Sequence, residues 1–440
     1  MSHRRFERKA LSVPSSRLSR LAKLGGLASS IAGNVAADAA RRFARGERPS
    51  MEDLLLTPAN AIKLADELAR MRGAAMKVGQ LISMDAGDML PPELADILAR
   101  LRSEAHHMPW VQLKRVLNAA WGADWRRKFA DFDVNPIAAA SIGQVHRARA
   151  LDGRDMAIKV QYPGVRASID SDVDNVSTLM RLAGLVPKGV DIAPMLAEAK
   201  RQLHEEADYQ SEGRRLAEFG ALLADRPEFS APALYEDLTR NNVLAMSYVE
   251  GGPIDDLATA PQGERDRVMT LLIGLLFREL FEFRLMQTDP NFANYLYAPK
   301  SGRIVLLDFG ATRAFPETFV TLYRRLLRSG MEGDRAGLRA AAREIGFLAA
   351  DAPEGLERAM LDMFELSIEP LRQETPFDFG ASDLALRLRD AGMALAEYRE
   401  HFTIPPMDTL FLQRKFGGIY LLATRMRARV DLRAQIAPHL

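Results

Sequence analysis

Two aspartates and one asparagine late in the chain have the types and spacing of a phosphoryl-transfer site. Asp289 lies five residues before Asn294, and Asp308 follows in the tripeptide Asp-Phe-Gly. In such a site one carboxylate faces the nucleophile, while an amide oxygen and a second carboxylate hold Mg²⁺ on the phosphates. We therefore predict that Asp289 occupies the catalytic position and that Asn294 and Asp308 bind Mg²⁺.

A lysine on a central strand should complete the nucleotide site. Residues 155–161 have the apolar alternation of a strand and carry Lys159. A lysine in such a strand can also be an edge or surface residue, but the downstream aspartate and asparagine favour a phosphate contact. The segment 197–212 reads as one charged helix without Gly or Pro. We expect Glu206 to pair with Lys159, and Glu205 to be a solvated neighbour.

Two further segments stand out by their small residues. At 138–141, where glycines would let backbone amides approach phosphates, the chain has three alanines and a serine. The same segment can be read as a small-residue turn before a strand. Far upstream, Lys77 and Gln80 share a helical segment with two glycines, which lower helix stability. Glycines at such positions indicate close packing against another element.

The elements that must position these residues follow from the sequence pattern. Residues 243–249 predict a strand that leads to a hinge at 250–253, where backbone groups would hold adenine. Residues 265–286 predict one apolar-periodic helix before the catalytic segment, and the chain is expected to be helical after residue 315.

These motifs, in their order along the chain, resemble the UbiB family of atypical kinases, also called ADCK proteins. The resemblance favours the ubiquinone-biosynthesis branch and runs from about Arg17 to the C-terminus. It implies an α+β, two-lobed protein-kinase-like fold with an N-terminal helical extension folded over the active site. We expect a basic, membrane-interacting arm at 1–50, a helical extension with the Lys-x-Gly-Gln motif at 51–131, an N-lobe at 132–250, and a C-lobe with a helical C-terminal extension at 251–440.

The resemblance also implies roles for individual residues. Lys159 would contact the α- and β-phosphates and pair with Glu206. Lys77 and Gln80 would lie where ordinary kinases dock a protein substrate, with Glu206 and Asp208 as acidic partners. The predicted catalytic set is Asp289, Lys77, Gln80, Glu206 and Asp208; the predicted nucleotide-binding set is Ala138, Ala139, Ala140, Ser141, Lys159, Met246 and Tyr248; the predicted metal ligands are Asn294 and Asp308.

The implied activity is that of a Mg²⁺-dependent ATPase or small-molecule kinase, with ATP/ADP and Mg²⁺ as cofactors, that supports ubiquinone (coenzyme Q) biosynthesis. In this family the Lys-x-Gly-Gln insertion and the Ala-rich segment disfavour protein phosphorylation. Gln287 and Thr288 replace the His-Arg that ordinary kinases place before the catalytic aspartate. A nucleotide-binding pseudokinase scaffold is the alternative, but a scaffold has no electrostatic need for two metal ligands and a base at these spacings.

Charge is unevenly distributed along the chain. Residues 1–50 contain eleven Lys/Arg and three Asp/Glu, a net charge of +8, so the remaining residues carry −7 of the overall +1. This arm favours anionic membrane lipids as partners, together with quinone precursors and ubiquinone-biosynthesis proteins; the lack of interleaved aromatics argues against nucleic acid. The apolar stretch 24–37 is shorter than the ~20 residues of a membrane span. Its small residues are equally compatible with internal helix pairing, a homodimer and lipid contact.

Composition also bears on the compartment. The chain has no cysteine, which excludes disulfides and thiolate metal sites. Its first two dozen residues are rich in Arg and Ser, as in a mitochondrial presequence. The Ala/Arg-heavy composition and the early start of the family-like region favour a bacterial cytoplasmic protein peripheral to the inner membrane, with the mitochondrial matrix as the alternative.

Overall fold

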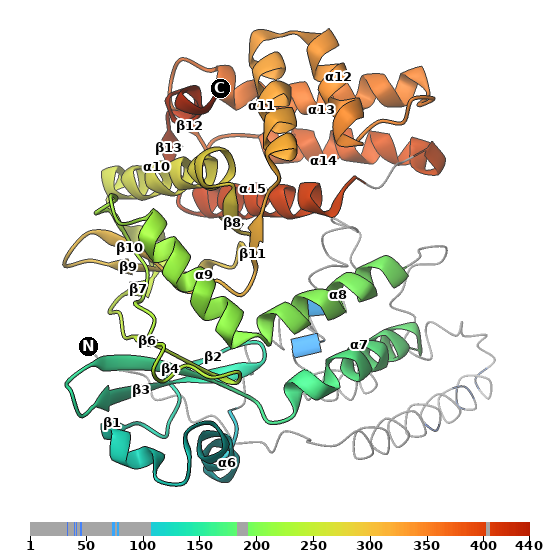
Figure 1. Ribbon diagram of the computed structural model, residues 1–440. Helices are drawn as coiled ribbons and strands as arrows, with labels where there is room; N and C mark the ends of the chain where they lie inside the picture. Colours follow the sequence, from blue (N-terminus) through green and yellow to red (C-terminus); the bar gives the residue numbers. More distant parts are fainter. Residues whose placement is uncertain are drawn as a thin grey trace. The chain divides into compact units, whose positions relative to one another are not determined.

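The computed structural model describes residues 107–182, 192–401 and 405–440, with isolated positions further upstream that include Gly73 and Lys77 (Figure 1). Apart from these isolated positions, the predicted basic arm and the part of the predicted extension before residue 107, including Gln80, lie outside the described residues. The chain divides into two compact units. Unit 1 comprises Met1–Arg214 and Ala233–Tyr248, and unit 2 comprises Arg215–Pro232 and Val249–Leu440.

Unit 1 is built on a five-stranded antiparallel sheet with the order β1-β3-β4-β6, in which β2 also pairs with β3. The strands are β1 (Phe129–Phe132), β2 (Ala138–Ala139), β3 (Gly143–Ala150), β4 (Asp155–Gln161) and β6 (Val243–Ser247). Apolar side chains of the sheet pack against α6 (Trp110–Trp121) in one core that includes Leu113, Trp125 and Ile158. The strand predicted at 155–161 is therefore present as the central strand β4.

Three helices follow strand β4: α7 (Val165–Leu182), α8 (Ala193–Glu206) and α9 (Tyr209–Leu222). A boundary between the units, after Arg214, falls within α9. The single helix predicted over 197–212 is wrong, because α8 ends at Glu206 and α9 begins after Asp208. Oδ1 of Asp208 accepts the backbone N–H of Ser211 at 3.0 Å. An aspartate stabilises a helix start in this way more than it stabilises a helix interior.

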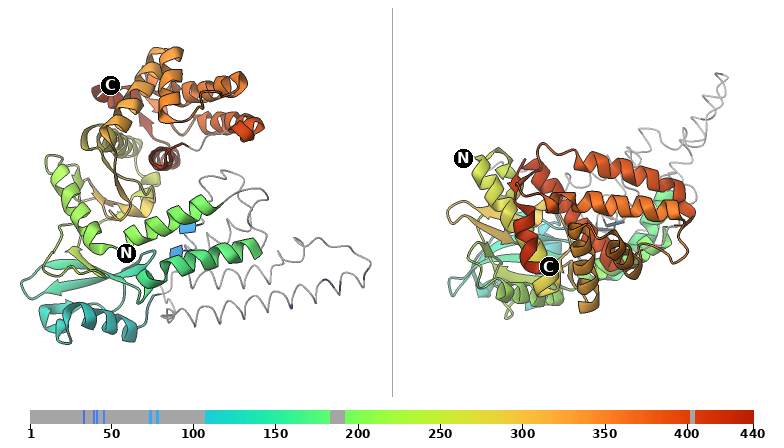
Figure 2. Two further views of the ribbon diagram at one scale, coloured as in Figure 1. Left: turned by 45° about the vertical axis from the view of Figure 1, so that its right-hand side comes forward. Right: turned by 90° about the horizontal axis from the view of Figure 1, so that it is seen from above.

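Unit 2 has a four-stranded sheet, β5-β10-β9-β7, and two separate two-stranded sheets, β11-β8 and β12-β13. Its strands are β5 (Phe229–Ser230), β7 (Gly252–Pro253), β8 (Leu285–Gln287), β9 (Tyr295–Ala298), β10 (Arg303–Leu306), β11 (Thr312–Ala314), β12 (Phe377–Asp378) and β13 (Arg429–Val430). Its longer helices are α10 (Gln262–Arg278), α11 (Glu317–Glu332), α12 (Arg335–Ile345), α13 (Glu354–Arg372), α14 (Leu384–Leu395) and α15 (Met407–Arg425), followed by the short α16 (Leu432–Ile436). Figure 2 shows these elements from two further directions.

The helix predicted over 265–286 ends earlier than expected. After α10 the chain makes one π-helical turn at Glu279–Phe283, Arg284 adopts a left-handed conformation with φ 52°, and β8 starts at Leu285. Strand β8 pairs with β11 in the register Gln287↔Thr312. The pairing of β8 with β11 decides where the helix ends. The spacing of apolar residues within 265–286 cannot predict such a long-range pairing.

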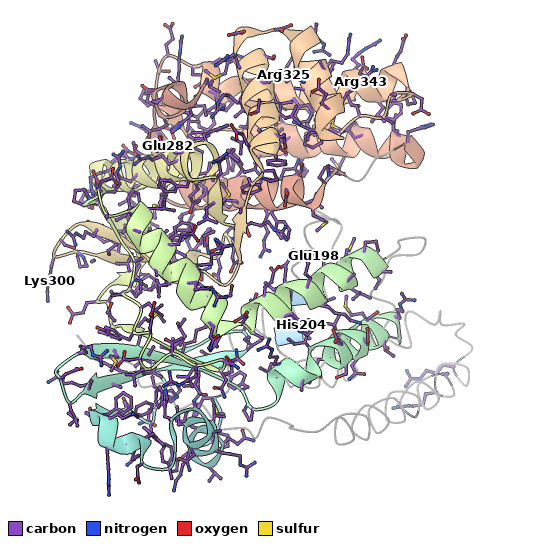
Figure 3. The ribbon with its side chains drawn as sticks, in the orientation of Figure 1. Glu198, His204, Glu282, Lys300, Arg325 and Arg343 are labelled. Atoms are coloured by element: carbon purple, nitrogen blue, oxygen red, sulfur yellow. The ribbon has the colours of Figure 1, made fainter. Side chains whose placement is uncertain are left out.

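Charged side chains join the helices of unit 2 on their exposed faces (Figure 3). Arg343 of α12, for example, lies 2.7 Å from the Glu357 carboxylate of α13. Within the described ranges, no helix is both long and apolar enough to cross a lipid bilayer.

Candidate functional site

Two neighbouring strands of unit 2 bring Asn294 and Asp308 to the same end of a sheet. Asn294 directly precedes β9, and Asp308 follows shortly after the end of β10. The antiparallel ladder pairs Tyr295 with Leu306, and one step beyond it the Leu307 N–H donates to the Asn294 carbonyl at 3.0 Å. Residues fourteen positions apart are therefore neighbours because of a tight β-hairpin.

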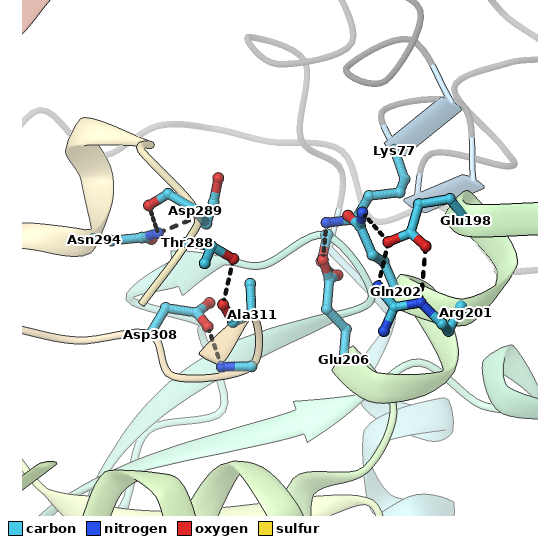
Figure 4. A network of polar contacts seen from close by, with 12 residues as sticks. Lys77, Glu198, Arg201, Gln202, Glu206, Thr288, Asp289, Asn294, Asp308 and Ala311 are labelled. Carbon is cyan, nitrogen blue, oxygen red and sulfur yellow. Dashed lines mark hydrogen bonds and ion pairs between the residues drawn. The ribbon is translucent and has the colours of Figure 1, made fainter. Parts of the chain in front are cut away.

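The segment between β8 and β9, residues 288–294, is called the catalytic loop below. Nδ2 of Asn294 donates to Oδ2 of Asp289 at 3.1 Å, which couples the predicted metal ligand to the predicted catalytic carboxylate (Figure 4). Oγ1 of Thr288 donates to the Ala311 carbonyl at 2.7 Å. This contact ties the start of the loop to the segment that follows Asp308.

The donor set suits Mg²⁺ that arrives with phosphate oxygens. Because Nδ2 of Asn294 donates to Asp289, the amide oxygen is the acceptor that remains for a cation. Within the described parts of the chain, no group of three His, Cys, Asp or Glu side chains forms an all-protein metal site. One amide and one carboxylate, completed by phosphates and water, is a coordination typical of Mg²⁺. Asn294 and Asp308 therefore fit a magnesium–nucleotide complex.

Asp289 has a cationic partner that the sequence reading missed. Nη2 of Arg414, on α15, donates to Oδ1 of Asp289 at 3.0 Å across 125 residues of chain. Gln287 and Thr288 occupy the positions directly before the aspartate, where ordinary kinases have His-Arg. No local sequence pattern predicts that Arg414 contacts Asp289, since Arg414 belongs to a helix far along the chain.

In unit 1 Lys159 is held by a glutamate other than the one predicted. The lysine lies on β4 between Val145 of β3 and Leu244 of β6. Its Nζ donates to both carboxylate oxygens of Glu212, at 2.7 and 3.0 Å, and both side chains are buried. The predicted pair with Glu206 is wrong, because the break between α8 and α9 places Glu212 in the first turn of a new helix.

Glu206 instead links two segments that the sequence singled out separately. Its carboxylate forms an ion pair with Lys77 and accepts a hydrogen bond from Oγ of Ser141 at 2.8 Å (Figure 4). A Cβ at Gly73 would lie 2.8 Å from Ile142 Cγ2 and 3.2 Å from the Ser141 carbonyl, so the glycine permits this close approach. Asp208, the other expected acidic partner, caps α9 through Ser211.

The Ala-rich segment forms a tight hairpin. Strand β2 pairs Ala138 with Val145 and Ala139 with Gln144, and the Ala140 N–H donates to the Gly143 carbonyl at 2.9 Å. The segment therefore has the geometry of a small-residue turn before a strand, and its contact with phosphates stays a prediction.

Two residues of the predicted nucleotide-binding set, Met246 and Tyr248, lie in β6 and directly after its end. Met246 is buried and pairs with Ala157 of β4. The Tyr248 N–H donates to the Asp155 carbonyl at 2.9 Å, and the Arg147 guanidinium lies 4.0 Å from the centre of the Tyr248 ring. One boundary between the units falls directly after Tyr248, and the predicted hinge residues 250–253 lie near the start of the second segment of unit 2, which begins at Val249.

Comparison with known proteins identifies relatives over most of the chain. Residues 100–342 match the ABC1 atypical kinase-like domain. The chain is 39% identical over 422 residues to the atypical kinase COQ8, mitochondrial, of Saccharomyces cerevisiae, with 96% of this chain and 84% of that protein covered. It is 39% identical over 429 residues to the atypical kinase coq-8, mitochondrial, of Caenorhabditis elegans. That alignment includes 96% of this chain but only 57% of the length of the worm protein.

A solved structure has a similar fold. The complex of Rv3197 with erythromycin from Mycobacterium tuberculosis aligns with a TM-score of 0.63 and 25% sequence identity, covering 85% of this chain and 93% of that one.

Proposed function

Because the chain belongs to the family with the ABC1 atypical kinase-like domain, we propose that it is a Mg²⁺-dependent ATPase or small-molecule kinase that supports ubiquinone biosynthesis at a membrane surface. The observation that carries the proposal is the arrangement of Asp289, Asn294 and Asp308 around one end of the β9-β10 hairpin. A nucleotide-binding scaffold would not require this combination of a carboxylate beside the acceptor and two oxygen ligands for a metal.

Each group has a defined task in phosphoryl transfer. Lys159, oriented by Glu212, contacts the α- and β-phosphates of ATP. Asn294 and Asp308 would hold Mg²⁺, which would supply positive charge to neutralise the phosphates. Asp289 orients the acceptor hydroxyl or water and takes its proton as the acceptor oxygen bonds to the γ-phosphorus and the bond to ADP breaks.

The contacts of Glu206 support a restriction on the acceptor. This carboxylate joins Lys77 to Ser141, so Lys77 is linked to the Ala-rich hairpin as one unit of contacts. We propose that this unit disfavours phosphorylation of other proteins and leaves turnover with water or a small lipid-like acceptor. Replacement of Lys77 by alanine is then expected to preserve ATP binding and to raise autophosphorylation.

Anionic lipids, quinone precursors and ubiquinone-biosynthesis proteins are the partners we propose, and a homodimer remains compatible with the sequence. The relatives from yeast and worm are both named as mitochondrial. Their names favour the mitochondrial alternative over the bacterial compartment that composition had favoured, and we propose the matrix face of a membrane as the place within it.

The decisive experiment removes one metal ligand. Asp308→Asn and Asn294→Ala should each lower Mg²⁺-dependent ATP turnover by about a hundredfold or more, because uncompensated phosphoryl charge raises the barrier. Asp378→Asn is a matched control, since Asp378 pairs with Arg429 on the surface at 2.9 Å and away from the loop. Unchanged turnover in a thermally stable Asp308→Asn protein would reject the site.

The scaffold alternative makes a different prediction in cells. Cells that carry Asp308→Asn should accumulate quinone intermediates if phosphoryl transfer matters. A scaffold would maintain the normal quinone profile in the same cells, because the variant keeps the fold and its protein contacts.

A further inference from the structure

One buried ammonium group contacts both ends of the catalytic loop. Nζ of Lys415 donates to Oε1 of Gln287, which directly precedes the loop, at 3.0 Å. The same Nζ donates to Oη of Tyr295, which directly follows the loop, at 2.6 Å. The side chains of all three residues are buried. A single cation therefore spans residues 288–294.

The backbone does not provide this link by itself. Strand β8, which ends at Gln287, pairs with β11, whereas β9, which begins at Tyr295, belongs to the sheet of β10, β7 and β5. No ladder hydrogen bond joins β8 to β9 in the described sheets. Backbone hydrogen bonds tie the two ends separately to the segment 307–311, from the Thr288 N–H to the Ala311 carbonyl and from the Leu307 N–H to the Asn294 carbonyl. Lys415 adds a direct side-chain link between the residues that flank the loop.

Burial of the Lys415 ammonium group costs free energy. Lys415 is 2% exposed and Glu279 is fully buried, with its Oε2 at 3.6 Å from Nζ. Taking a charged lysine out of water costs several kcal/mol, which its partners must offset. Burial raises the pKa of Glu279 to about 7, and the ammonium opposes that rise. An apolar residue would fill the same space without this cost.

The helix that carries Lys415 contacts the loop at two more points. Arg414, the preceding residue, donates to Asp289. A Cβ at Gly418 would lie 2.0 Å from Cβ of Pro290, so only glycine lets α15 pack directly on the loop at this point. One face of α15 thus contacts the loop and its flanking residues through the Arg414–Asp289 ion pair, the buried Lys415 ammonium and the backbone at Gly418.

We propose that Lys415 is a positioning residue, which sets the spacing between Asp289 and Asn294 by joining the two ends of the catalytic loop through Gln287 and Tyr295. Lys415 itself touches no substrate. The inference rests on the proposed function, since the spacing matters because Asn294 ligates Mg²⁺ beside the catalytic carboxylate. Loosening the loop should therefore weaken the cooperation between Mg²⁺ and nucleotide before it affects the phosphate contact of Lys159.

The test removes one hydrogen bond at a time. Tyr295→Phe keeps the aromatic ring and deletes the hydroxyl that accepts from Lys415. Tyr297→Phe is the matched control, because Tyr297 lies on the same strand and its hydroxyl donates to Glu264, away from the loop. The first readout is hydrogen exchange in the protein without ligand, at the amides of Asn294 and Leu307, which report the loop end and its link to β10.

Tyr295→Phe is expected to accelerate exchange at these two amides by about tenfold, the effect of losing one hydrogen bond to a charged group. The second readout is calorimetric binding of a non-hydrolysable ATP analogue over a range of Mg²⁺ concentrations. The Mg²⁺ concentration for half-maximal binding should rise about tenfold in Tyr295→Phe and stay unchanged in Tyr297→Phe. Lys415→Arg, which keeps the charge, should retain more of the wild-type Mg²⁺ dependence than Lys415→Met.

The outcomes separate this inference from the function on which it rests. Wild-type exchange and wild-type Mg²⁺ dependence in Tyr295→Phe would overturn the role of Lys415, even if the protein hydrolyses ATP. If the wild-type protein binds no magnesium–nucleotide, the proposed function fails, while the exchange measurement still decides whether Lys415 holds the loop. Tyr295→Phe keeps the test decisive where Lys415→Met fails to fold.

Discussion

Each unit buries a lysine beside a glutamate, and the two pairs are built differently. In unit 1 Lys159 donates to both oxygens of Glu212. In unit 2 Lys415 donates to two neutral acceptors, and Glu279 lies 3.6 Å away. Neither oxygen of Glu279 has a hydrogen-bond partner among the described residues.

The difference indicates two distinct tasks. A lysine that donates hydrogen bonds to a carboxylate can exchange part of that interaction for a phosphate when a nucleotide binds. A lysine enclosed by two acceptors and a carboxylate from three separate elements cannot leave them without breaking the structure. The comparison therefore favours a role in nucleotide binding for Lys159 and a role in stabilising the fold for Lys415.

The largest expected effect is on stability. Lys415→Met should lower the free energy of unfolding by about 3–5 kcal/mol, because it leaves a buried carboxyl without its cation and two polar groups without their common donor. Denaturant titration measures the loss. Lys300→Met is the control, since Lys300 is 90% exposed and its pair with Glu250 should contribute less than about 1 kcal/mol. A loss below 1 kcal/mol for Lys415→Met would remove the distinction between the two lysines.

Replacing the glutamate of each pair should change ATP affinity in unit 1 but not in unit 2. Glu212→Gln is expected to weaken ATP binding by about tenfold, because Lys159 loses the charged partner that orients it. Glu279→Gln should leave ATP affinity unchanged, since Lys415 keeps its bonds to Gln287 and Tyr295. Calorimetric titration with Mg²⁺ and ATP checks both, and equal losses in the two variants would contradict the assignment.

The units should also respond to pH in opposite directions. The pKa of Glu279 in unit 2 is raised by burial from 4.5 to about 7, so its contribution to stability falls as pH rises through that interval. The pKa of His146 in unit 1 is lowered by burial from 6.5 to about 4, so its contribution falls as pH decreases from 6.5 toward 4.

Burial is the main reason that the pKa of His146 is lowered, and the hydrogen bond at Nε2 acts in the same direction. Nδ1 lies 2.9 Å from the Asp133 carbonyl and must donate to it, so Nε2 accepts from the Gln144 amide at 2.8 Å. A proton on Nε2 would face that amide nitrogen. Unfolding free energies measured from pH 4 to 8 should therefore lose their alkaline decline in Glu279→Gln and their acidic decline in His146→Gln. A profile that neither variant alters would contradict both assignments.

The smallest expected effect concerns the Ala-rich hairpin. Ala139→Gly should tighten ATP binding by no more than about fivefold, because removing one Cβ lets the backbone approach the phosphates. Ala130→Gly on the exposed position of β1 is the control for a general effect of glycine in this sheet. Equal or weaker ATP affinity for Ala139→Gly would count against an inhibitory hairpin.

The sequence alone was informative wherever the relevant distance along the chain is short. The strand carrying Lys159 has its predicted bounds, 155–161, because alternation of side chains is a local property. Asn294 and Asp308 could be placed together because a short hairpin separates them. The order of the motifs likewise indicated the family whose domain the chain matches over residues 100–342.

Tertiary structure decided which partners these residues meet. Glu212 rather than Glu206 pairs with Lys159 because Asp208 starts a new helix and redirects the glutamates on either side of it. Arg414 and Lys415 reach the catalytic loop across 125 and 128 residues of chain, through a helix whose own sequence carries no catalytic signal. Charge, burial and spacing across such separations depend on how whole elements pack, and periodicity within one element does not encode that packing.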